Sequence, residues 1–384
     1  MIRSLSAHQT RMLRVKAQRL EPAQAASLTA PDLVLRDVFA VQAQDLPAAL
    51  LSIRARSAGL TAVQLVQALQ KDHTIAWTWC MRSTMHLINA QDARWLIPFL
   101  GPVFIAANGR RFRQLGWDEK QASSGLFLLK KALAERGEMT RSEIASLLEQ
   151  NGLPHQGQAT IHLISRSALE GILCMGANSQ GKPTYVLYED WIGGLQPLAP
   201  QDALAELASR YLGAYGPACP EDMASWTGLK LTTAREAWQL IEKRLVEVEA
   251  AGRPAWMLKE HFAWLDDLPE DNFSGPTGFA PIVRLLSSFD TYLLGYANRD
   301  LVVEVAYAKH IHPGGGLIYP VMLVDGCALG TWKARRSGNH QLIMISPFEK
   351  LADELLPLIE AEVADLGRFQ GNKADLVLEA PLKA

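Results

Sequence analysis

Two glutamines spaced two residues apart are the first candidates for chemistry in this sequence. The segment Gln42-Ala43-Gln44-Asp45 follows an apolar-periodic run from Leu33 to Val41 that predicts a helix. Side chains two positions apart diverge by about 200° on a helix, so Gln42 and Gln44 can serve one site only where the chain leaves helical geometry. Pro47 favours such a departure, because proline disfavours helical geometry at the preceding residue. Amides are not bases near neutral pH, so this pair can hold a water molecule and present carbonyl dipoles to a developing positive charge.

Two alternatives to this interpretation remain open. Spacing alone favours solvent-exposed or helix-cap glutamines, because exposed amides are common. Asp45 adds a carboxylate next to the pair. If Asp45 faces the reacting atoms in place of Gln44, the site gains a true general base. We favour the glutamines over Asp45.

A second polar group alternates along residues 74–89. Arg82, Thr84 and His86 stand at period two, which predicts that they share one face of a strand. Such a row can line a polar cleft or contact phosphate. It equally fits the solvent-facing side of a half-buried hairpin, which the pattern alone favours.

The densest basic cluster is Arg110-Arg111-Phe112-Arg113. Arginine suits phosphate contacts because its guanidinium presents forked donors. A solvated helix end that interacts with its own dipole explains the cluster equally well. Net charge is −2 with a pI near 6.5, so a polyanionic partner must be bound by a local basic patch of this kind.

Metal, cofactor and membrane chemistry find little support. His310 and His312 stand two apart on a predicted strand, but no third ligand has a recognisable spacing, and we predict no metal site and no cofactor. The four cysteines are far apart, which is typical of a reducing compartment. The longest uncharged apolar stretch, residues 95–108, is shorter than a membrane span and contains two prolines. We expect a cytoplasmic, nucleoid-associated protein with no membrane partner.

The elements that must position these residues follow an internal repeat. Residues 140–147 and 220–226 align at an offset of 79, and the same offset reaches Thr61. Around the later two copies the pattern predicts three helices and then a hairpin, with turns at 181–183 and 252–254; this order is typical of a winged helix. The first copy is irregular, with one short helix before the β-rich residues 74–88, as if its recognition helix were lost or moved.

The C-terminal part has a different sequence pattern, which is typical of strands. Apolar, β-branched runs at 301–306, 318–324 and 342–345 are separated by glycine-rich turns, including Asp325-Gly326, and predict an antiparallel, barrel-like β-domain. A helix over 348–366 closes the fold. The predicted fold is α+β and mainly α: three tandem winged-helix units, a β-barrel-like domain and a C-terminal helix. The boundaries are 1–118, 119–197, 198–268 and 279–384, with a linker at 267–278.

These segments together resemble the AlkZ-type winged-helix DNA glycosylases, over residues 30–332. The resemblance rests on the Gln42-Ala43-Gln44 segment, on Met81 to Leu87, on Phe289-Asp290, and on Val324-Asp325-Gly326 followed by Gly330-Thr331-Trp332. It implies a molecule that cradles duplex DNA, with Gln42 and Gln44 at the catalytic centre. The implied activity is monofunctional removal of alkylated bases, including N7-alkylguanine adducts and interstrand crosslinks.

The resemblance also implies a kind of leaving group and a set of residues that contact DNA. An N7- or N3-alkylated purine is already cationic and leaves as a neutral base, so positioned water suffices where an undamaged base needs protonation. We expect Arg82, Thr84, His86, Arg299 and the cluster of Arg110, Arg111 and Arg113 to line the site or contact DNA. No suitably placed lysine is recognisable for a lyase step. The expected partner is double-stranded DNA with alkylated bases, bound by a monomer.

Two departures and two rival functions remain. Asn298-Arg299 stands where an acidic residue before arginine is expected, and the middle residue of the glutamine motif is Ala43 in place of a larger apolar group. The rivals are a non-catalytic winged-helix DNA-binding regulator and a protein-interaction scaffold, the second of which the acidic pI keeps open.

Overall fold

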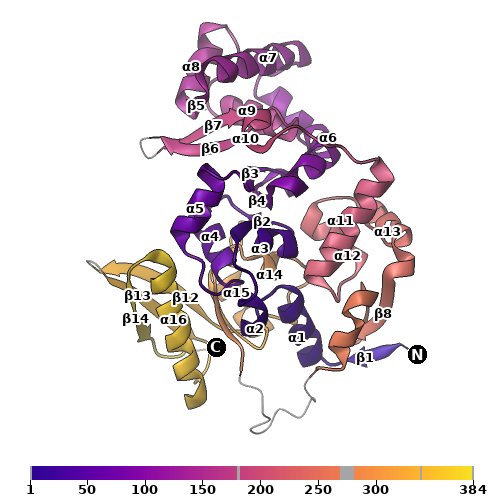
Figure 1. Ribbon diagram of the computed structural model, residues 1–384, viewed down its shortest axis with the longest axis vertical. Helices are drawn as coiled ribbons and strands as arrows, with labels where there is room; N and C mark the ends of the chain where they lie inside the picture. The colour runs from indigo at the N-terminus through magenta and orange to yellow at the C-terminus, as the bar shows by residue number, and fades with distance from the viewer. Residues whose placement is uncertain (1, 180–181, 269–280, 338–339, 383–384) are drawn as a thin grey trace. The chain divides into compact units, whose positions relative to one another are not determined.

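The computed structural model describes residues 2–179, 182–268, 281–337 and 340–382. The chain divides into two compact units, residues 66–203 and residues 1–65 together with 204–384. Both mix helices and strands (Figure 1), so the α+β prediction is confirmed. Among the helices formed by the described residues, none has the length and apolar character required to cross a bilayer. The predicted linker at 267–278 lies, from residue 269 on, outside the described residues.

The unit of residues 66–203 begins with a hairpin and a long helix. The end of α5 (Ala62–Gln70) leads directly to strand β3 (Ile75–Trp79), which pairs antiparallel with β4 (Met85–Asn89). The first repeat therefore has no helix between its short helix and its hairpin, as its irregular pattern indicated. Helix α6 (Ala90–Gln114) follows and contains Pro98 and Pro102.

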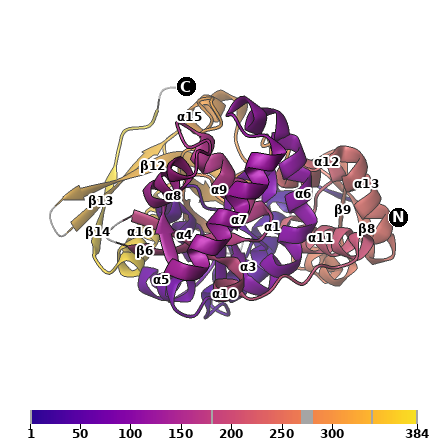
Figure 2. The same ribbon diagram turned by 90° about the horizontal axis from the view of Figure 1, so that it is seen from above.

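The rest of this unit places three helices before a hairpin. Asp118 with Gln121 and Thr140 with Glu143 form capping boxes that fix the first residues of α7 and α8. The elements are α7 (Glu119–Arg136), β5 (Glu138–Thr140), α8 (Arg141–Gln150), α9 (Ala159–Leu169), β6 (Leu173–Ser179), β7 (Lys182–Leu187) and α10 (Tyr188–Ile192). The strands form a sheet in the order β5-β7-β6. Figure 2 shows α7, α8 and α9 grouped together, and the predicted order of helices and hairpin is present.

Helix α6 packs on α9 with almost no space between the backbones. A Cβ atom on Gly101 would lie 1.9 Å from the carbonyl oxygen of Leu169, so only glycine fits at this crossing. The arginines at the end of α6 are thereby held beside α9.

The other unit starts with short helices and a strand from the N-terminus. Its first elements are β1 (Arg3–Leu5), α1 (Ala7–Ala17), α2 (Pro22–Ala25), α3 (Pro31–Val38), β2 (Val41–Gln42) and α4 (Leu46–Arg54). The third repeat follows as α11 (Pro200–Tyr215), α12 (Pro220–Thr227), α13 (Leu231–Leu240), β8 (Leu245–Ala250) and β9 (Arg253–Leu258). Strand β1 pairs parallel with β8, a partner that the repeat pattern did not reveal. The turn before β9 is one residue earlier than predicted, because Arg253 already pairs with Ala250.

A five-stranded sheet forms the C-terminal part, in the order β10-β11-β12-β13-β14. Its strands are β10 (Val283–Leu286), β11 (Val321–Val324), β12 (Cys327–Ser337), β13 (His340–Pro347) and β14 (Lys373–Leu378). The predicted turn at Asp325-Gly326 connects β11 to β12, and both of its residues have positive φ. The all-antiparallel prediction is wrong at one place: β14 follows the last helix and pairs parallel with β13.

Two further predictions for this part are corrected. Residues 301–306 form no strand; they are a turn that leads into a short 3-10 helix at Val305–Tyr307. The last helix, α16 (Leu356–Gln370), begins eight residues later than predicted, after a 3-10 turn and with a proline in its first turn.

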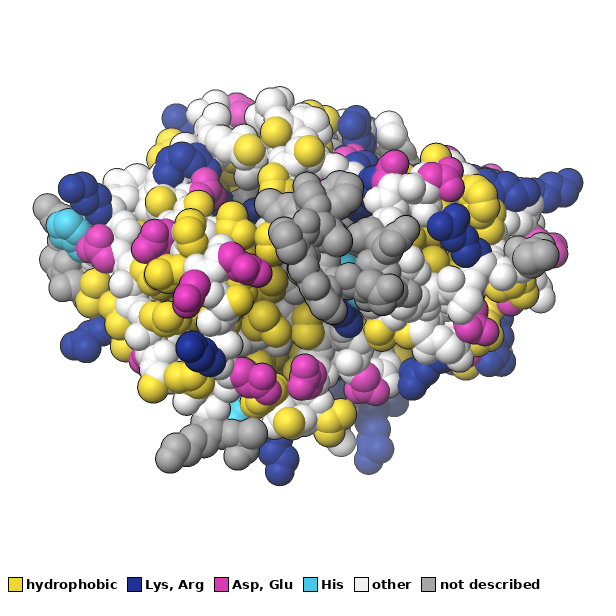
Figure 3. Space-filling model, turned by 90° about the horizontal axis from the view of Figure 1, so that it is seen from below, with side chains coloured by type: hydrophobic (Ala, Val, Ile, Leu, Met, Phe, Trp, Pro, Cys, Tyr) yellow, Lys and Arg dark blue, Asp and Glu magenta, His cyan; other side chains and the backbone are white. Residues whose placement is uncertain are grey.

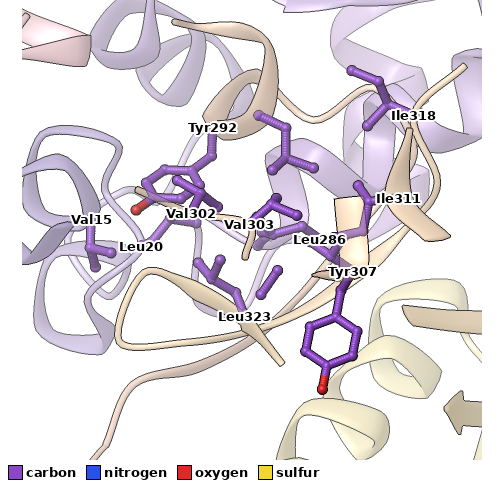
Figure 4. Close-up of a cluster of buried hydrophobic side chains, with 14 of the residues drawn as sticks. Val15, Leu20, Leu286, Tyr292, Val302, Val303, Tyr307, Ile311, Ile318 and Leu323 are labelled. Atoms are coloured by element: carbon purple, nitrogen blue, oxygen red, sulfur yellow. The ribbon is translucent and has the colours of Figure 1, made fainter. Parts of the chain in front are cut away.

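The sheet has an apolar core on each side. Helix α16 packs against β10 and β14 and contributes Ile359, Val363 and Leu366 to one of these cores. A second core joins Leu286 and Leu323 of the sheet to Val15 and Leu20 of the N-terminal segment and to α14 (Thr291–Leu294), as Figure 4 shows. The N-terminal helices and the C-terminal sheet are therefore parts of one folded unit.

Candidate active site

The two glutamines lie where the chain leaves helical geometry. Helix α3 ends at Val38, and Phe39 adopts a positive φ of 72°, which turns the chain into the extended β2. Residues two apart on an extended chain face the same side. The Nε2 atom of Gln42 donates a hydrogen bond to Oε1 of Gln44 at 2.9 Å, while Ala43 between them is buried. The pair thus shares one face, as the motif required.

The break occurs earlier than Pro47 suggested. Pro47 belongs to the first turn of α4, where a missing N–H has no helical partner to lose. Phe39 ends α3 and Pro47 helps to start α4, so the glutamines occupy a short non-helical segment between two helices, with Gln42 in β2 and Gln44 in the bend that follows. The expected departure from helical geometry is confirmed, and its cause is corrected.

Asp45 has a structural task in this segment. Its side chain is exposed and accepts a hydrogen bond from the backbone N–H of Ala48 at 3.2 Å, which caps the N-terminus of α4. One carboxylate oxygen therefore serves the helix. Gln44 is exposed and Gln42 is half-buried, so solvent reaches both amides.

A buried polar network fixes α4 behind the glutamines. Asp290 accepts hydrogen bonds from Ser52 of α4 at 2.7 Å and from two nitrogens of Arg56, the shorter at 2.7 Å. Arg54 donates to Glu362 of α16 at 2.9 Å. Sequence reasoning missed Ser52, Arg54 and Arg56 and singled out Asp290 without assigning it chemistry, since the partners are far apart along the chain.

A cavity of about 520 Å³ is lined by the start of α4, beginning at Asp45, the residue after Gln44. Asp45 and Pro47 of the α4 start line one part of it. The remaining wall includes Ser287, Tyr319, Trp332 and Lys333 from the C-terminal sheet and its loops. Its volume falls within the range of about 300–1,000 Å³ that is usual for small-molecule sites.

Arg82, Thr84 and His86 do not alternate along one strand. Arg82 is in a 3-10 turn at Met81–Ser83 with φ of 52°, Thr84 follows this turn, and only His86 belongs to β4. His86 is 2% exposed, and its Nδ1 lies 3.0 Å from the carbonyl oxygen of Thr84. Burial, with a smaller effect of the nearby Arg82, lowers the pKa of His86 to about 3. A buried, neutral imidazole is unsuited to a phosphate contact. The prediction that the three side chains share one polar strand face is wrong, because only His86 belongs to the strand.

Arg110, Arg111 and Arg113 are all exposed at the C-terminal end of α6. Arg111 donates to the Gln158 side chain, just before α9, at 2.7 Å. Arg113 lines a hollow of about 180 Å³ with His162 and Arg166 of α9. Arg166 is engaged by Glu119 and Glu170, both at 2.9 Å, so the cluster at the end of α6 presents the more accessible positive charge.

Charges elsewhere are mixed. On the face drawn in Figure 3, basic and acidic side chains are interspersed with hydrophobic ones. Arg299 is largely buried, donates to the carbonyl oxygen of Leu293, and has its pKa lowered by burial. Its principal contact is therefore structural. His310 belongs to the short helix α15 (Ala308–Ile311) and His312 follows it, not the predicted strand. Within the described ranges, no group of three or more His, Cys, Asp and Glu side chains is arranged to hold a metal ion.

Comparisons with known proteins identify the family of this chain. An interstrand DNA cross-link repair glycosylase from Streptomyces sahachiroi is 28% identical over 374 residues, covering 93% of this chain and 95% of that protein. The solved structure of the DNA glycosylase AlkZ from the same organism matches with a TM-score of 0.80 at 23% identity, covering 98% of this chain and all of that one. The model of the family described as DNA glycosylase AlkZ-like matches residues 35–369. This chain therefore belongs to the AlkZ-like family and is a DNA glycosylase.

Proposed function

We propose that this protein hydrolyses the N-glycosidic bond of N7- and N3-alkylated purines in duplex DNA, including purines in interstrand crosslinks. Gln42 and Gln44 hold the attacking water and stabilise positive charge on the sugar. The hydrogen bond between their amides carries the proposal, because it sets both side chains on one face, and the next residue, Asp45, lines a cavity. The relative from Streptomyces sahachiroi is an interstrand DNA cross-link repair glycosylase, which supports crosslinked DNA as a substrate.

The chemistry of amides explains the choice of lesion. The carbonyl dipoles stabilise the oxocarbenium ion that forms as the base departs, but the amides accept no proton at neutral pH. A cationic alkylated purine needs no protonation, because it leaves as a neutral base. Undamaged purines should therefore be poor substrates.

The remaining parts serve DNA binding in this proposal. Residues 119–197 and 198–268 act as winged-helix units, and residues 1–118 as an irregular third one. Arg110, Arg111 and Arg113 contact phosphates. The protein acts as a monomer and is associated with the nucleoid. Arg82 and Thr84 remain candidates for contacts with the DNA channel, whereas His86 and Arg299 act through packing.

We further propose that the enzyme has no lyase activity. Lys333 lines the cavity beside Asp45, but its Nζ atom is paired with Glu379 at 3.3 Å. An ammonium group in an ion pair has no lone pair to form a Schiff base. Borohydride reduction during turnover should therefore trap no covalent DNA adduct. A trapped adduct that disappears in Lys333→Met would show the opposite.

Release of base from a duplex containing N7-methylguanine tests the main proposal. Wild type should produce abasic sites, and Gln42→Ala and Gln44→Ala should each slow release by about a hundredfold or more, the usual effect of removing a transition-state contact. Duplex affinity should stay nearly unchanged in both. Gln201→Ala, which alters an exposed glutamine on α11, is the matched control.

The outcomes separate the rival functions. A wild type that binds duplex but releases no alkylated base would favour a DNA-binding regulator. Absence of salt-sensitive duplex binding would favour an interaction scaffold. Normal base release by both glutamine variants would remove the catalytic role of the pair.

A further inference from the structure

The cavity beside Asp45 is formed by five separate parts of one unit, one of which is β13 with Ser346. Asp45 and Pro47 come from the start of α4, and Ser287 follows β10. Trp332 lies on β12, and Tyr319 on the loop before β11. Segments distant in sequence thus converge on about 520 Å³ of space, in which a flat bicyclic ring with a substituent fits.

Tyr319 is presented to this cavity by an anchored loop. Gly314, Gly315 and Gly316 all have positive φ, and the chain then runs through Leu317, Ile318 and Tyr319. Ile318 is 5% exposed and belongs to the core drawn in Figure 4, whereas Tyr319 is 46% exposed. The backbone N–H of Tyr319 also donates to the carbonyl oxygen of Ile311 at 3.0 Å. The backbone of Tyr319 is therefore held in place, while its exposed side chain contributes to the cavity lining.

The other walls make the cavity largely apolar and fixed in shape. The indole N–H of Trp332 donates to the carbonyl oxygen of Leu286 at 2.7 Å, and Trp332 is 6% exposed. Pro47, Pro320 and Leu51 add apolar surface. An aromatic face and apolar walls suit a planar ring system, because nucleobases stack favourably on aromatic side chains.

The charges around the cavity favour a cation. Asp45, whose carboxylate caps α4, is one of the lining residues, and the face of a tyrosine ring attracts positive charge. Among the described residues that line the cavity, Lys333 is the one cationic side chain, and it is paired with Glu379. Hydrogen bonds from Ser346 and Lys333 lower the pKa of the Glu379 carboxyl, which keeps the compensating negative charge in place.

We infer that this cavity receives the alkylated purine itself, with Tyr319 stacked on the cationic ring and Asp45 facing its positive charge. The inference rests on the proposed function and identifies where the base is recognised. Asp45 directly follows Gln44, so their Cα atoms are about 3.8 Å apart. A base held in the cavity therefore has its sugar near the glutamine segment.

Binding of free nucleosides tests the inference without DNA and without turnover. 7-Methylguanosine carries a positive charge on its purine ring and guanosine does not, although the two have nearly the same shape. Titration calorimetry should show wild type binding 7-methylguanosine about tenfold more tightly than guanosine, within the range expected for cation–π and carboxylate contacts. Tyr319→Ala should weaken 7-methylguanosine binding about tenfold, and Tyr319→Phe should retain it, because the ring remains.

Leu317→Ala is the matched control. Leu317 is 48% exposed on the same loop but is not part of the cavity lining, so its removal should leave nucleoside binding unchanged. Unchanged circular dichroism and urea midpoints would show that each variant is folded. Equal binding of the two nucleosides by wild type, or equal effects of Tyr319→Ala and Leu317→Ala, would overturn the inference.

The test also separates this inference from the proposed function. If wild type releases N7-methylguanine and Tyr319→Ala releases it equally fast, the function stands and the base-binding role of Tyr319 is wrong. If 7-methylguanosine binds in a Tyr319-dependent way but no base is released from any alkylated duplex, the pocket stands and the proposed reaction is wrong.

Discussion

Arg56 and Asp290 form an ion pair at 2.7 Å with both side chains fully buried, although they are 234 residues apart. Arg56 follows α4, and Asp290 caps α14 by accepting from the N–H of Tyr292 at 2.9 Å. Ser52 of α4 and Thr291 of α14 join the same network. The network therefore fixes α4, the helix that follows Gln42 and Gln44, to the C-terminal part of the fold.

Asp290→Asn should strongly destabilise the protein. The change leaves the Arg56 guanidinium buried without its counter-charge, and breaking a buried pair in this way costs about 3–5 kcal/mol. Urea denaturation gives the free energy of unfolding. Asp353→Asn removes an exposed carboxylate from the same unit and should change that free energy by less than about 0.5 kcal/mol. A loss below about 1 kcal/mol in Asp290→Asn would mean that the pair contributes little.

Local features of the fold were predictable from sequence, and long-range ones were not. The capping boxes at Asp118 and Thr140 and the turn at Asp325-Gly326 depend on residues within three positions of one another. The Arg56–Asp290 pair and the parallel pairing of β1 with β8 join distant segments, and no local pattern encodes them. Phe39 was not recognisable as a helix end, because a bulky residue disfavours positive φ.

The apolar run at 301–306 shows that a sequence pattern can predict burial correctly without predicting a strand. Val302 and Val303 are buried in the core drawn in Figure 4, as a strand prediction required. The backbone, however, follows a turn, and Val305 is 81% exposed. Short apolar runs do not distinguish a strand from any other buried segment. The candidate site was likewise only partly predictable from the sequence. The motif indicated the glutamine pair, but the cavity also contains Tyr319 and Trp332, which are distant in the sequence.

Asp45→Asn should leave base release largely intact. Asparagine caps a helix about as well as aspartate, so the N-terminus of α4 should be retained. If the glutamines position water, the release rate should fall by less than about tenfold, whereas loss of a general base typically costs about 10²–10⁴. Single-turnover release of N7-methylguanine gives the rate. A fall of a hundredfold or more in the release rate, with unchanged stability, would show that the Asp45 carboxylate is the general base.

Burial of His86 should make stability depend on pH. Because its folded pKa of about 3 lies below the ordinary 6.5, the unfolded chain binds the proton more readily between these values. The contribution of neutral His86 is therefore complete above about pH 6.5 and decreases as the pH falls towards 3. NMR of the ring protons, assigned with His86→Gln, should show no titration of His86 between pH 5 and 8. Titration near 6.5 would place the ring in solvent and reopen a contact with DNA.

The arginines at the end of α6 should determine part of the salt dependence of duplex binding. Each phosphate contact releases counterions, so its loss lowers the slope of log K against log salt by about 0.9. Arg110→Ala and Arg113→Ala should each reduce the slope by this amount and weaken binding uniformly across sequences. Fluorescence anisotropy over a range of salt concentrations measures both quantities. Lys130→Ala, which removes an exposed charge from α7, is the control and should leave the slope unchanged. Equal slopes for all three variants and wild type would show that the cluster is a solvated helix end and not a phosphate contact.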